Sequence, residues 1–350
     1  MIIINILIFI CFFILYFFRE SYFSELAISF LPYIWGFLLF VVLYWIIQLW
    51  KNLYNKPIYK NLKLKYSPFF LIWFWILFWL YANELNSFYN QNFLEDETLS
   101  SPIKIFYSNI YKENYNYEAI KDSIQKENPD VVMFVEFSDE HEDNLKRFIN
   151  EKYPYYDKTN RSRIFWGSVV MSKYPITNFF NQYKQDGSRR YGYFMIKKDN
   201  IPYYFYLIHT SSPVTNFDYQ KRNQQLTTIK KDFYTQHEEQ RETESKIIML
   251  GDFNVSPRSI FYKKFAESFP SFKNITRSQK IFFSWNLSEM LKIHKDFEFL
   301  PKRFRNNIGY FPLLWSHIDQ IFVSNSVKVS NFKKIHIAWS DHDWVVFEIE

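Results

Sequence analysis

The amino-acid sequence predicts an α/β domain with mixed β-sheets, preceded by a membrane part. Two observations predict the domain: short apolar runs of strand character recur along the second part of the chain, and amphipathic helical stretches lie between several of them. A third observation predicts the membrane part, because the first 85 residues contain three long runs without a charged side chain. Strands that alternate with both helices and hairpins are typical of mixed sheets, not of a purely parallel sheet.

Composition excludes several classes of protein. The 350 residues are 48% hydrophobic and 22% aromatic, with one cysteine and six glycines, so a disordered, collagen-like or disulfide-rich protein is excluded. The formal net charge is +6, but residues 86–350 hold nearly equal numbers of acidic and basic side chains. The domain therefore lacks the basic excess that is typical of a dedicated nucleic-acid-binding protein.

The three uncharged runs cover residues 1–18, 26–50 and 66–83. A helix needs about 20 apolar residues to cross the hydrocarbon core of a bilayer, so each run predicts a transmembrane helix. The first run lacks a basic segment at its start and a small-residue cleavage site at its end, which disfavours a cleaved secretory signal. We therefore expect a multi-pass membrane anchor over residues 1–85.

The loops between the runs predict the orientation of the anchor. Loop 51–67 carries five lysines and no acid, whereas loop 19–25 carries one arginine and two glutamates. Because Lys and Arg accumulate on the cytoplasmic side, loop 51–67 and the N-terminus are expected in the cytoplasm. Residues 86–101 then form a polar linker to an extracytoplasmic domain over residues 102–350. The expected location is a bacterial-type cytoplasmic membrane with the lipid bilayer as partner; no protein partner is predicted.

The apolar runs and helical stretches give the expected elements of the domain. Strands are predicted over residues 103–109, 131–137, 167–172, 191–197, 203–209, 246–252, 318–324 and 344–350. The pair around residues 198–202 (KDNIP) predicts a hairpin. Helices are predicted over residues 116–128, 219–233 and 256–269, the last with Ser256 as N-cap and Pro257 in the first turn.

Strongly polar residues stand at the ends of these predicted strands. Four of them end or nearly end a strand, and three begin or directly precede one. In chain order they are Asn109, Glu136, His209, Asp252, Asp319, Asp341 and His342. Each alone has an ordinary structural explanation, such as turn formation. If the last two strands run antiparallel to the others, however, all of these side chains gather at one rim of the sheets, where ligands bind in open α/β folds.

The combination indicates a particular chemistry. In GDFN (251–254) a carboxylate and an amide project to the same side if the segment is extended, and in SDHDW (340–344) a carboxylate and an imidazole are adjacent. Oxygen ligands such as Asn109, Glu136 and Asp341 suit Mg²⁺ or Mn²⁺, whereas the absence of an HExxH pattern disfavours zinc. A carboxylate that activates water, a metal ion and a histidine held by an aspartate together support phosphoester hydrolysis.

At these residues the chain resembles the endonuclease/exonuclease/phosphatase superfamily over about residues 102–350. The resemblance implies a four-layer α/β sandwich with two mixed β-sheets and magnesium-dependent attack of water on a phosphate. It implies metal ligation by Asn109, Glu136 and Asp341. The catalytic roles that it implies are orientation or deprotonation of water by Asp252, contact with the phosphate and transition state by Asn254, contact with the scissile phosphate by His342, orientation of His342 by Asp319, and phosphate contact or general-acid action by His209.

Three further residues are candidate substrate contacts. Lys173 in GSVVMSKYPI stands where similar segments often have arginine, and lysine keeps the charge without the bidentate fork. His317, two residues before Asp319, is either a group at or behind the substrate site or a surface histidine. Arg222 either binds an anionic headgroup or lies on a solvated helix face.

The membrane part narrows the expected substrate. Anchoring helices before such a domain resemble a bacterial subgroup of the superfamily that includes a teicoplanin-resistance-type membrane protein, which implies a phosphorylated lipid substrate such as a polyprenyl diphosphate. An anchor would confine the active site to the bilayer surface, where lipid-linked phosphates are concentrated. The alternatives are an extracytoplasmic nuclease acting on nucleic acid, a sphingomyelinase-like phosphodiesterase, and an anchored binding module without activity.

Overall fold

The computed structural model describes residues 20–29, 47, 99–158, 167–181, 191–237, 245–278, 284–293, 298–303, 315–337 and 339–350. The runs 1–18 and 66–83, predicted to span a membrane, lie outside the described residues, as does nearly all of the run 26–50. Among the helices within the described ranges, none combines the length and the apolar character needed to cross a bilayer. The transmembrane helices therefore stay predictions.

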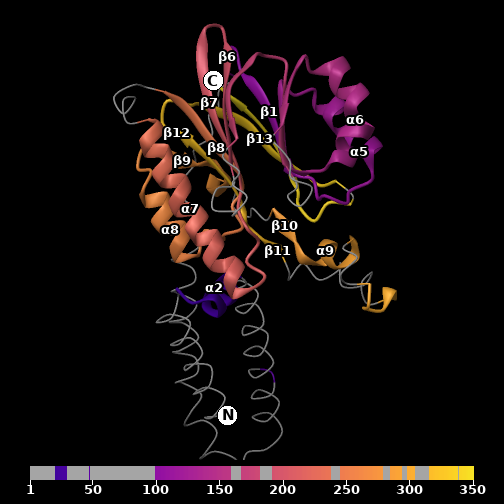
Figure 1. Cartoon of the computed structure of the whole chain (residues 1–350), viewed down its shortest axis with the longest axis vertical. Coiled ribbons are helices and arrows are strands. Elements are labelled where there is room, and N and C mark those ends of the chain that lie inside the picture. The colour runs from indigo at the N-terminus through magenta and orange to yellow at the C-terminus, as the bar shows by residue number, and fades with distance from the viewer. Residues whose placement is uncertain are drawn as a thin grey trace, which may run out of the picture.

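Two six-stranded sheets face each other in the domain (Figure 1). The first has the order β13-β14-β1-β2-β4-β3, formed by Val329–Ile335, Trp344–Ile349, Ile103–Asn109, Val131–Phe137, Gly167–Ser172 and Tyr155–Lys158. The second has the order β5-β6-β7-β8-β12-β9, formed by Ile176–Asn181, Tyr191–Lys198, Ile201–His209, Lys246–Asp252, Asp319–Ser324 and Phe272–Asn274. Both sheets are mixed, because β1 runs parallel to β2 and β7 parallel to β8 while the other pairs are antiparallel.

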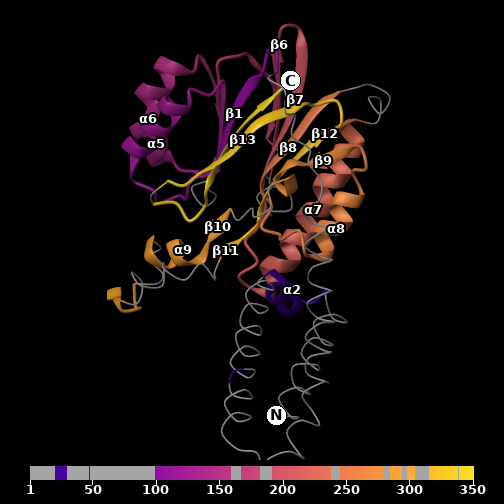
Figure 2. The same cartoon turned by 180° about the vertical axis from the view of Figure 1, so that it is seen from behind.

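Helices cover the outer face of each sheet, as the two opposite views show (Figures 1 and 2). The first sheet is covered by α5 (Tyr117–Glu127) and α6 (Asp139–Lys152), and the second by α7 (Asn216–Gln236) and α8 (Ile260–Glu267). The resulting order is helix, sheet, sheet, helix, so the expected α/β sandwich with two mixed sheets is confirmed. The remaining elements are α2 (Tyr22–Ser29), η1 (Ile275–Ser278), β10 (Trp285–Asn286), α9 (Leu287–Ile293) and β11 (Trp315–Ser316).

The domain has three apolar layers, and side chains that alternate along β1 contribute to two of them. Ile105 and Tyr107 point between the sheets, where they pack with buried residues of β2, β7, β8 and β12. Phe106 points to the opposite face and packs with buried residues of α5 and α6. A third cluster lies between the second sheet and α7 and α8. Because closely packed sheets keep a spacing of about 10 Å, the middle layer fixes how far the strand ends of one sheet lie from those of the other.

All eight strands expected from the sequence are present as β1, β2, β4, β6, β7, β8, β12 and β14, with ends that differ by at most two residues. The expected hairpin is β6 and β7, and its turn residues Asp199 and Asn200 have φ of 51° and 64°, which is typical of a two-residue hairpin turn. The antiparallel direction expected of the last two strands is also present, since β12 runs antiparallel to β8 and β14 antiparallel to β1.

The expected N-cap of α8 is wrong by three residues. Ser259, not Ser256, accepts a hydrogen bond from Phe261 N at 3.1 Å, and the helix begins at Ile260. Ser256 and Pro257 belong to a turn before the helix, in which Ser259 N donates to Ser256 O at 2.8 Å. The sequence offers two serines three positions apart, and the helix begins after the second because the chain first turns at Ser256.

Gly251 is required where β8 approaches β7. Its φ is 149°, and a Cβ atom at this position would lie 1.8 Å from the carbonyl oxygen of Ile208 on the neighbouring strand. A side chain here would therefore force the two parallel strands apart, one residue before Asp252.

We expect Gly251→Ala to lower the free energy of unfolding by about 3 kcal/mol, because the overlap is with backbone that cannot move aside. Urea unfolding followed by tryptophan fluorescence measures this change. Lys246→Ala, at the other end of β8, is the control and should cost less than about 1 kcal/mol. Equal stability of the two variants would contradict the proposed close approach.

Candidate active site

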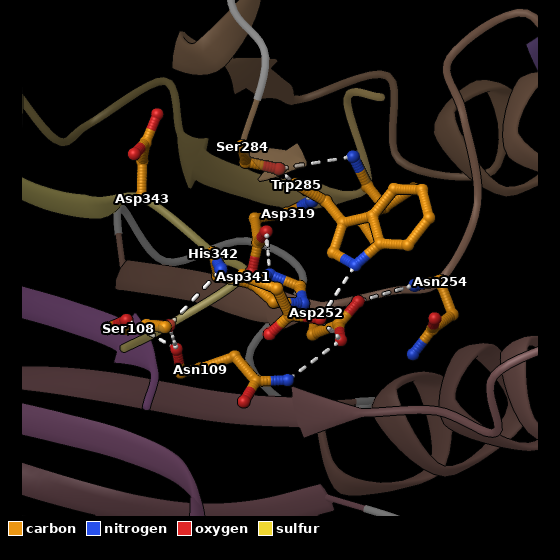
Figure 3. A network of polar contacts seen from close by, with 12 residues as sticks. Ser108, Asn109, Asp252, Asn254, Ser284, Trp285, Asp319, Asp341, His342 and Asp343 are labelled. Atoms are coloured by element: carbon orange, nitrogen blue, oxygen red, sulfur yellow. Dashed lines mark hydrogen bonds and ion pairs between the residues drawn. The ribbon is translucent and has the colours of Figure 1, made fainter. Parts of the chain in front are cut away.

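The polar residues expected at one rim of the sheets do meet there, and Figure 3 shows Asn109, Asp252, Asp319, Asp341 and His342 among them. Asn109 and Glu136 come from the ends of β1 and β2, and Asp341 and His342 directly precede β14 of the same sheet. From the second sheet come His209 and Asp252 at the ends of β7 and β8, Asp319 at the start of β12, and Asn254 from the loop after β8. The register of the second sheet pairs Asp252 with both His209 and Asp319. The rim lies at the end of the domain where β10, β11 and α2 are seen in Figures 1 and 2.

A chain of buried polar contacts crosses the gap between the sheets. The Tyr107 hydroxyl donates to Asp319 Oδ1 at 2.7 Å, and the other carboxylate oxygen lies 2.7 Å from His342 Nδ1. The opposite nitrogen of this ring, Nε2, lies 3.7 Å from Asp252 Oδ2. Asp252, Asp319 and His342 are each less than 5% exposed. Asp319 therefore fixes the orientation of the imidazole and leaves Nε2 facing the carboxylate of Asp252.

The contacts of His342 favour its protonated form. Burial by itself would lower the pKa of the imidazole, but the carboxylate of Asp319, followed by those of Asp252 and Asp341, outweighs burial and raises the pKa well above its usual value. A positively charged imidazolium at this position can donate a hydrogen bond from Nε2 and stabilise negative charge on a phosphoryl oxygen.

The pKa of the Asp252 carboxyl group is also raised. Burial raises the pKa of Asp252 to about 8, His342 opposes this rise, and the carboxylates of Asp319 and Glu136 add to it. A carboxyl group whose pKa is raised toward neutrality is suited to accept a proton from water, because an effective general base has a pKa near the working pH.

The segment after Asp252 turns sharply. Asn254 has a φ of 48°, so the extended conformation that would project its side chain to the same side as that of Asp252 is not adopted. The Asn254 backbone N–H instead donates to Asp252 Oδ1 at 2.9 Å, and its side-chain amide donates to Thr210 O at 3.1 Å. Thr210 in turn donates through Oγ1 to Phe253 O at 2.6 Å. The loops that follow β7 and β8 are therefore joined to each other, and the turn holds the carboxylate of Asp252.

Asn109 and Glu136 form the part of the site that comes from β1 and β2. Asn109 Nδ2 donates to Glu136 Oε1 at 3.0 Å and to Asp252 Oδ2 at 3.2 Å. The second oxygen of Glu136 accepts from Lys112 N at 3.2 Å, and His209 Nε2 lies 3.7 Å from Oε1. Glu136 has a φ of 59°, an uncommon conformation for this residue type, and it lies at an irregularity in the ladder between β2 and β4, where the register shifts between Phe134 and Phe137. Glu136 is the most solvent-accessible of these groups.

Asp341 is held by residues that the sequence did not indicate. Trp285 Nε1 donates to Asp341 Oδ2 at 2.9 Å, and Asn286 N donates to Asp341 O at 2.8 Å. Ser284 Oγ accepts from Asp319 N at 3.0 Å. Residues 284–286 are more than 30 positions from both aspartates in the sequence, so no local pattern could have revealed these contacts. Tyr107 could have been found, because it lies two residues before Asn109 on the same strand face.

The donor set fits a divalent cation. Among the residues that the structure describes, no three His, Cys, Asp or Glu side chains converge in an arrangement ready to bind metal. The oxygen atoms of Glu136, Asp341 and Asn109 are nevertheless the ligand type that Mg²⁺ and Mn²⁺ prefer. The amide nitrogen of Asn109 now faces two carboxylates, so ligation through Oδ1 requires this amide to turn over. A cation would also relieve the repulsion among carboxylates that raises the pKa of Asp252.

Lys173 does not join the cluster. Its Nζ lies 3.2 Å from Asp130 Oδ1, directly before β2, and therefore at the opposite end of this strand from Glu136. This position corrects the prediction that Lys173 contacts substrate.

Arg222 and His317 are both buried, which overturns the interpretations of a solvated helix face and a surface histidine. Arg222 pairs with Glu25 and donates to Asn254 O, so its guanidinium is already engaged and the expected contact with an anionic headgroup is corrected as well. His317 Nε2 lies 2.8 Å from Thr276 Oγ1 in η1. Burial, with the nearby positive charges of Arg258 and Arg277, lowers the pKa of His317 well below its usual value. His317 is therefore enclosed and neutral.

Comparison with known proteins gives a consistent result. The model of the endonuclease/exonuclease/phosphatase family matches residues 106–342. No curated protein sequence matches significantly. Among solved structures, SmcL is similar with a TM-score of 0.52 and 17% identity, covering 72% of this chain and 100% of its own.

Two other solved structures give similar values. A mutant beta toxin from Staphylococcus aureus with bound magnesium ions has a TM-score of 0.50 and 17% identity, covering 71% of this chain and 99% of its own. TDP2 from D. rerio, complexed with a single-strand DNA product, has a TM-score of 0.52 and 14% identity, covering 72% of this chain and 100% of its own. At these identities the likeness concerns the fold.

The raised pKa values of Asp252 and His342 predict a pH dependence of stability without metal. Each group binds its proton more tightly in the folded chain, so its stabilising contribution is complete below the unfolded values of 3.8 and 6.5 and is lost as pH rises through the folded ones. In the presence of a chelator, the thermal midpoint is expected to fall between about pH 6 and about pH 9.

Asp252→Asn should make this fall shallower, because it removes one of the two groups. Asp122→Asn, an exposed substitution on α5, is the control and should follow the unmodified chain. Thermal melts at several pH values measure the effect, and a midpoint that rises with pH over this range would contradict it.

Proposed function

Because this chain belongs to the endonuclease/exonuclease/phosphatase family, we propose that it is a divalent-metal-dependent phosphoesterase that cleaves a phosphodiester or diphosphate bond with an activated water molecule. The observation that carries this proposal is the line from Asp319 through His342 to Asp252, beside Asn109 and Glu136 at the same rim. Base, positive charge and oxygen ligands for a cation are the parts that such hydrolysis needs.

Each residue of the rim has its own role in the proposed hydrolysis. Asp252 orients a water molecule and accepts its proton, with its own carboxylate held by the backbone N–H of Asn254. His342, oriented by Asp319, donates from Nε2 to an oxygen of the phosphate, where negative charge develops during attack. The side chain of Asn254 and the imidazole of His209, whose Nε2 lies 3.7 Å from Glu136 Oε1, are the further phosphate contacts of this proposal.

Glu136 and Asp341 would hold Mg²⁺ or Mn²⁺, together with Asn109 after its amide has turned. The ion supplies positive charge next to the phosphoryl oxygens and helps to position the substrate. Trp285 keeps one oxygen of Asp341 in place through its indole N–H. The backbone N–H of Lys112 does the same for Glu136. The protein thereby limits the freedom of both carboxylates before any ion binds.

A lipid-linked phosphate at the outer face of a membrane is the substrate class that we propose. Three uncharged runs in residues 1–85 support an anchor. The helix α2, which begins in loop 19–25 between the first two runs, docks on the catalytic domain. Large apolar side chains are exposed where α2 meets the start of α7, namely Phe23, Val214 and Phe217 at 77%, 73% and 71%. An exposed apolar patch of this kind suits contact with lipid.

Nucleic acid is the second candidate substrate. One structural neighbour is complexed with a single-strand DNA product, and the same chemistry at phosphorus would serve a nuclease. The balanced charge of residues 86–350 argues against a strong electrostatic contribution to DNA binding. A binding module without activity is disfavoured because all eight residues of the rim are in place.

Removal of the base or of the phosphate contact should abolish turnover. We expect Asp252→Ala and His342→Ala to lower kcat/KM at least about a thousandfold on a chromogenic phosphodiester with Mg²⁺. Lys173→Ala should retain activity, because Lys173, although predicted from the sequence to contact substrate, lies away from the rim. Circular dichroism verifies folding, and near-normal turnover by either rim variant would remove the proposed mechanism.

The substrate class is tested by magnesium-dependent phosphate release from a polyprenyl diphosphate in detergent by the full-length chain. Asp252→Ala serves as the blank and plasmid DNA as the competitor. We expect release that disappears in the variant and is indifferent to DNA. Nicking of the plasmid without phosphate release would instead support the nuclease.

A further inference from the structure

The helix α2 lies beside one end of α7 (Figure 1), and polar contacts attach it to the catalytic domain at several points. The Tyr22 hydroxyl donates to Val214 O at 2.6 Å, and the Tyr219 hydroxyl donates to Glu20 O at 2.6 Å. The rings of Tyr22 and Tyr219 lie edge to face with centroids 5.7 Å apart. A segment more than 180 residues away in the sequence thus binds the loop after β7 and the first turn of α7.

An ion pair lies at the centre of this attachment. Glu25 Oε1 is 2.5 Å from Arg222 Nη2, and the second oxygen of Glu25 accepts from Ser259 Oγ at 2.8 Å. Glu25 is 5% exposed and Arg222 is 0% exposed. Removal of either partner would leave a buried charge without compensation, which is far more damaging than the loss of a surface pair.

The same guanidinium extends the contact to the catalytic loop. Arg222 Nη1 donates to the carbonyl oxygen of Asn254 at 2.7 Å, and the Asn254 N–H holds Asp252 Oδ1. Asn254 adopts a φ of 48°, a conformation that non-glycine residues keep only where the surroundings impose it. The hydrogen bond from Arg222 is one of the contacts that impose it.

We propose that Glu25 and Arg222 are positioning residues through which the N-terminal segment 20–29 fixes the turn at Asn254, and hence the carboxylate of Asp252. Glu25 neutralises Arg222, and Arg222 holds the turn. The proposal rests on the proposed function in that Asp252 and Asn254 act in hydrolysis. This segment, in which the second predicted transmembrane run begins, is then a part of the active-site scaffold as well as a connection, and displacement of α2 lowers turnover.

The first test compares two glutamates of the same segment in the full-length chain. Glu25→Gln removes the buried charge, and Glu20→Gln removes an exposed one that pairs with Lys264 at 2.7 Å. With bis(4-nitrophenyl) phosphate and Mg²⁺ as the probe, we expect Glu25→Gln to lower kcat about tenfold with KM changed less than about twofold. Glu20→Gln should leave both constants unchanged, because exposed pairs contribute little. Equal kcat for the two variants would overturn the proposal.

A double variant separates positioning from stability. Glu25→Leu with Arg222→Met removes both charges. The thermal midpoint of this double variant should therefore lie closer to that of the unmodified chain than the midpoint of Glu25→Gln does. The kcat should stay low, since Arg222→Met leaves the carbonyl oxygen of Asn254 without the donor that holds it. Recovery of kcat together with the midpoint would reduce the pair to a structural role and overturn the proposal.

Hydrogen exchange tests the inference without reference to any substrate. In the double variant, we expect faster amide exchange at residues 253–256 and unchanged exchange in α5, on the other side of the domain. Unchanged exchange at residues 253–256 would overturn the positioning role even if the enzyme is active. An unmodified chain without turnover, but with the expected exchange, would place the failure in the proposed function instead.

Discussion

The candidate site depends on the apolar layer between the two sheets. Neither sheet carries the whole site: Asn109, Glu136, Asp341 and His342 belong to one, and His209, Asp252, Asn254 and Asp319 to the other. The hydrogen bonds that make these residues a unit, from Asn109 to Asp252 and between His342 and Asp319, cross from sheet to sheet. Their lengths are set by the thickness of the buried layer beneath them, to which Tyr107 contributes its ring while its hydroxyl binds Asp319. The packing between the sheets therefore determines the geometry of the candidate site.

This constraint explains why the site can keep several charges out of water. Buried carboxylates repel one another, and the raised pKa of Asp252, due first to burial, expresses the cost. The cost is met by fixed donors: the backbone N–H of Asn254, the hydroxyl of Tyr107, the indole of Trp285 and the imidazole of His342. Groups already oriented in this way need no reorganisation when charge develops on a substrate. The fold thus carries a permanent electrostatic strain, which the proposed cation and phosphate would relieve.

The sequence predicted the parts of the structure whose signal is local. The buried strands are short apolar runs, and their polar ends alone were enough to predict that β1, β2, β7 and β8 finish at one rim. The helix α6 was not expected, because only Leu145, Phe148 and Ile149 among its described core residues are aliphatic or aromatic, within a strongly charged segment. Its N-cap, Ser138, forms a capping box with His141, a residue less usual in that position than glutamate or glutamine.

What the sequence could not give is the pairing of distant residues. Arg222 occurs in a polar helical stretch, where a solvated position is the ordinary expectation. Its charge can be buried because Glu25, from a distant part of the sequence, forms an ion pair with it. Trp285 and Ser284 reach Asp341 and Asp319 through a two-stranded pairing of β10 with β11 that has no recognisable strand pattern. Contacts of this kind depend on tertiary structure, and they supply the orientation that local motifs leave open.

The docking of α2 also bears on the choice between a lipid and a nucleic acid. An active site that is anchored to a membrane meets substrates in that membrane at a high effective concentration. This advantage exists only when the active site faces the membrane surface. Tyr22 and Glu25 attach α2 to the start of α7 and to the segment before α8, at the end of the domain that carries the rim. The exposed side chains of Phe23 and Val214 lie on the two segments that Tyr22 joins. If the run that begins within α2 enters a bilayer, the rim is held close to the lipid headgroups in an orientation that the buried ion pair keeps fixed. A substrate in solution gains nothing from such an arrangement, whereas a phosphate carried by a lipid gains both concentration and orientation.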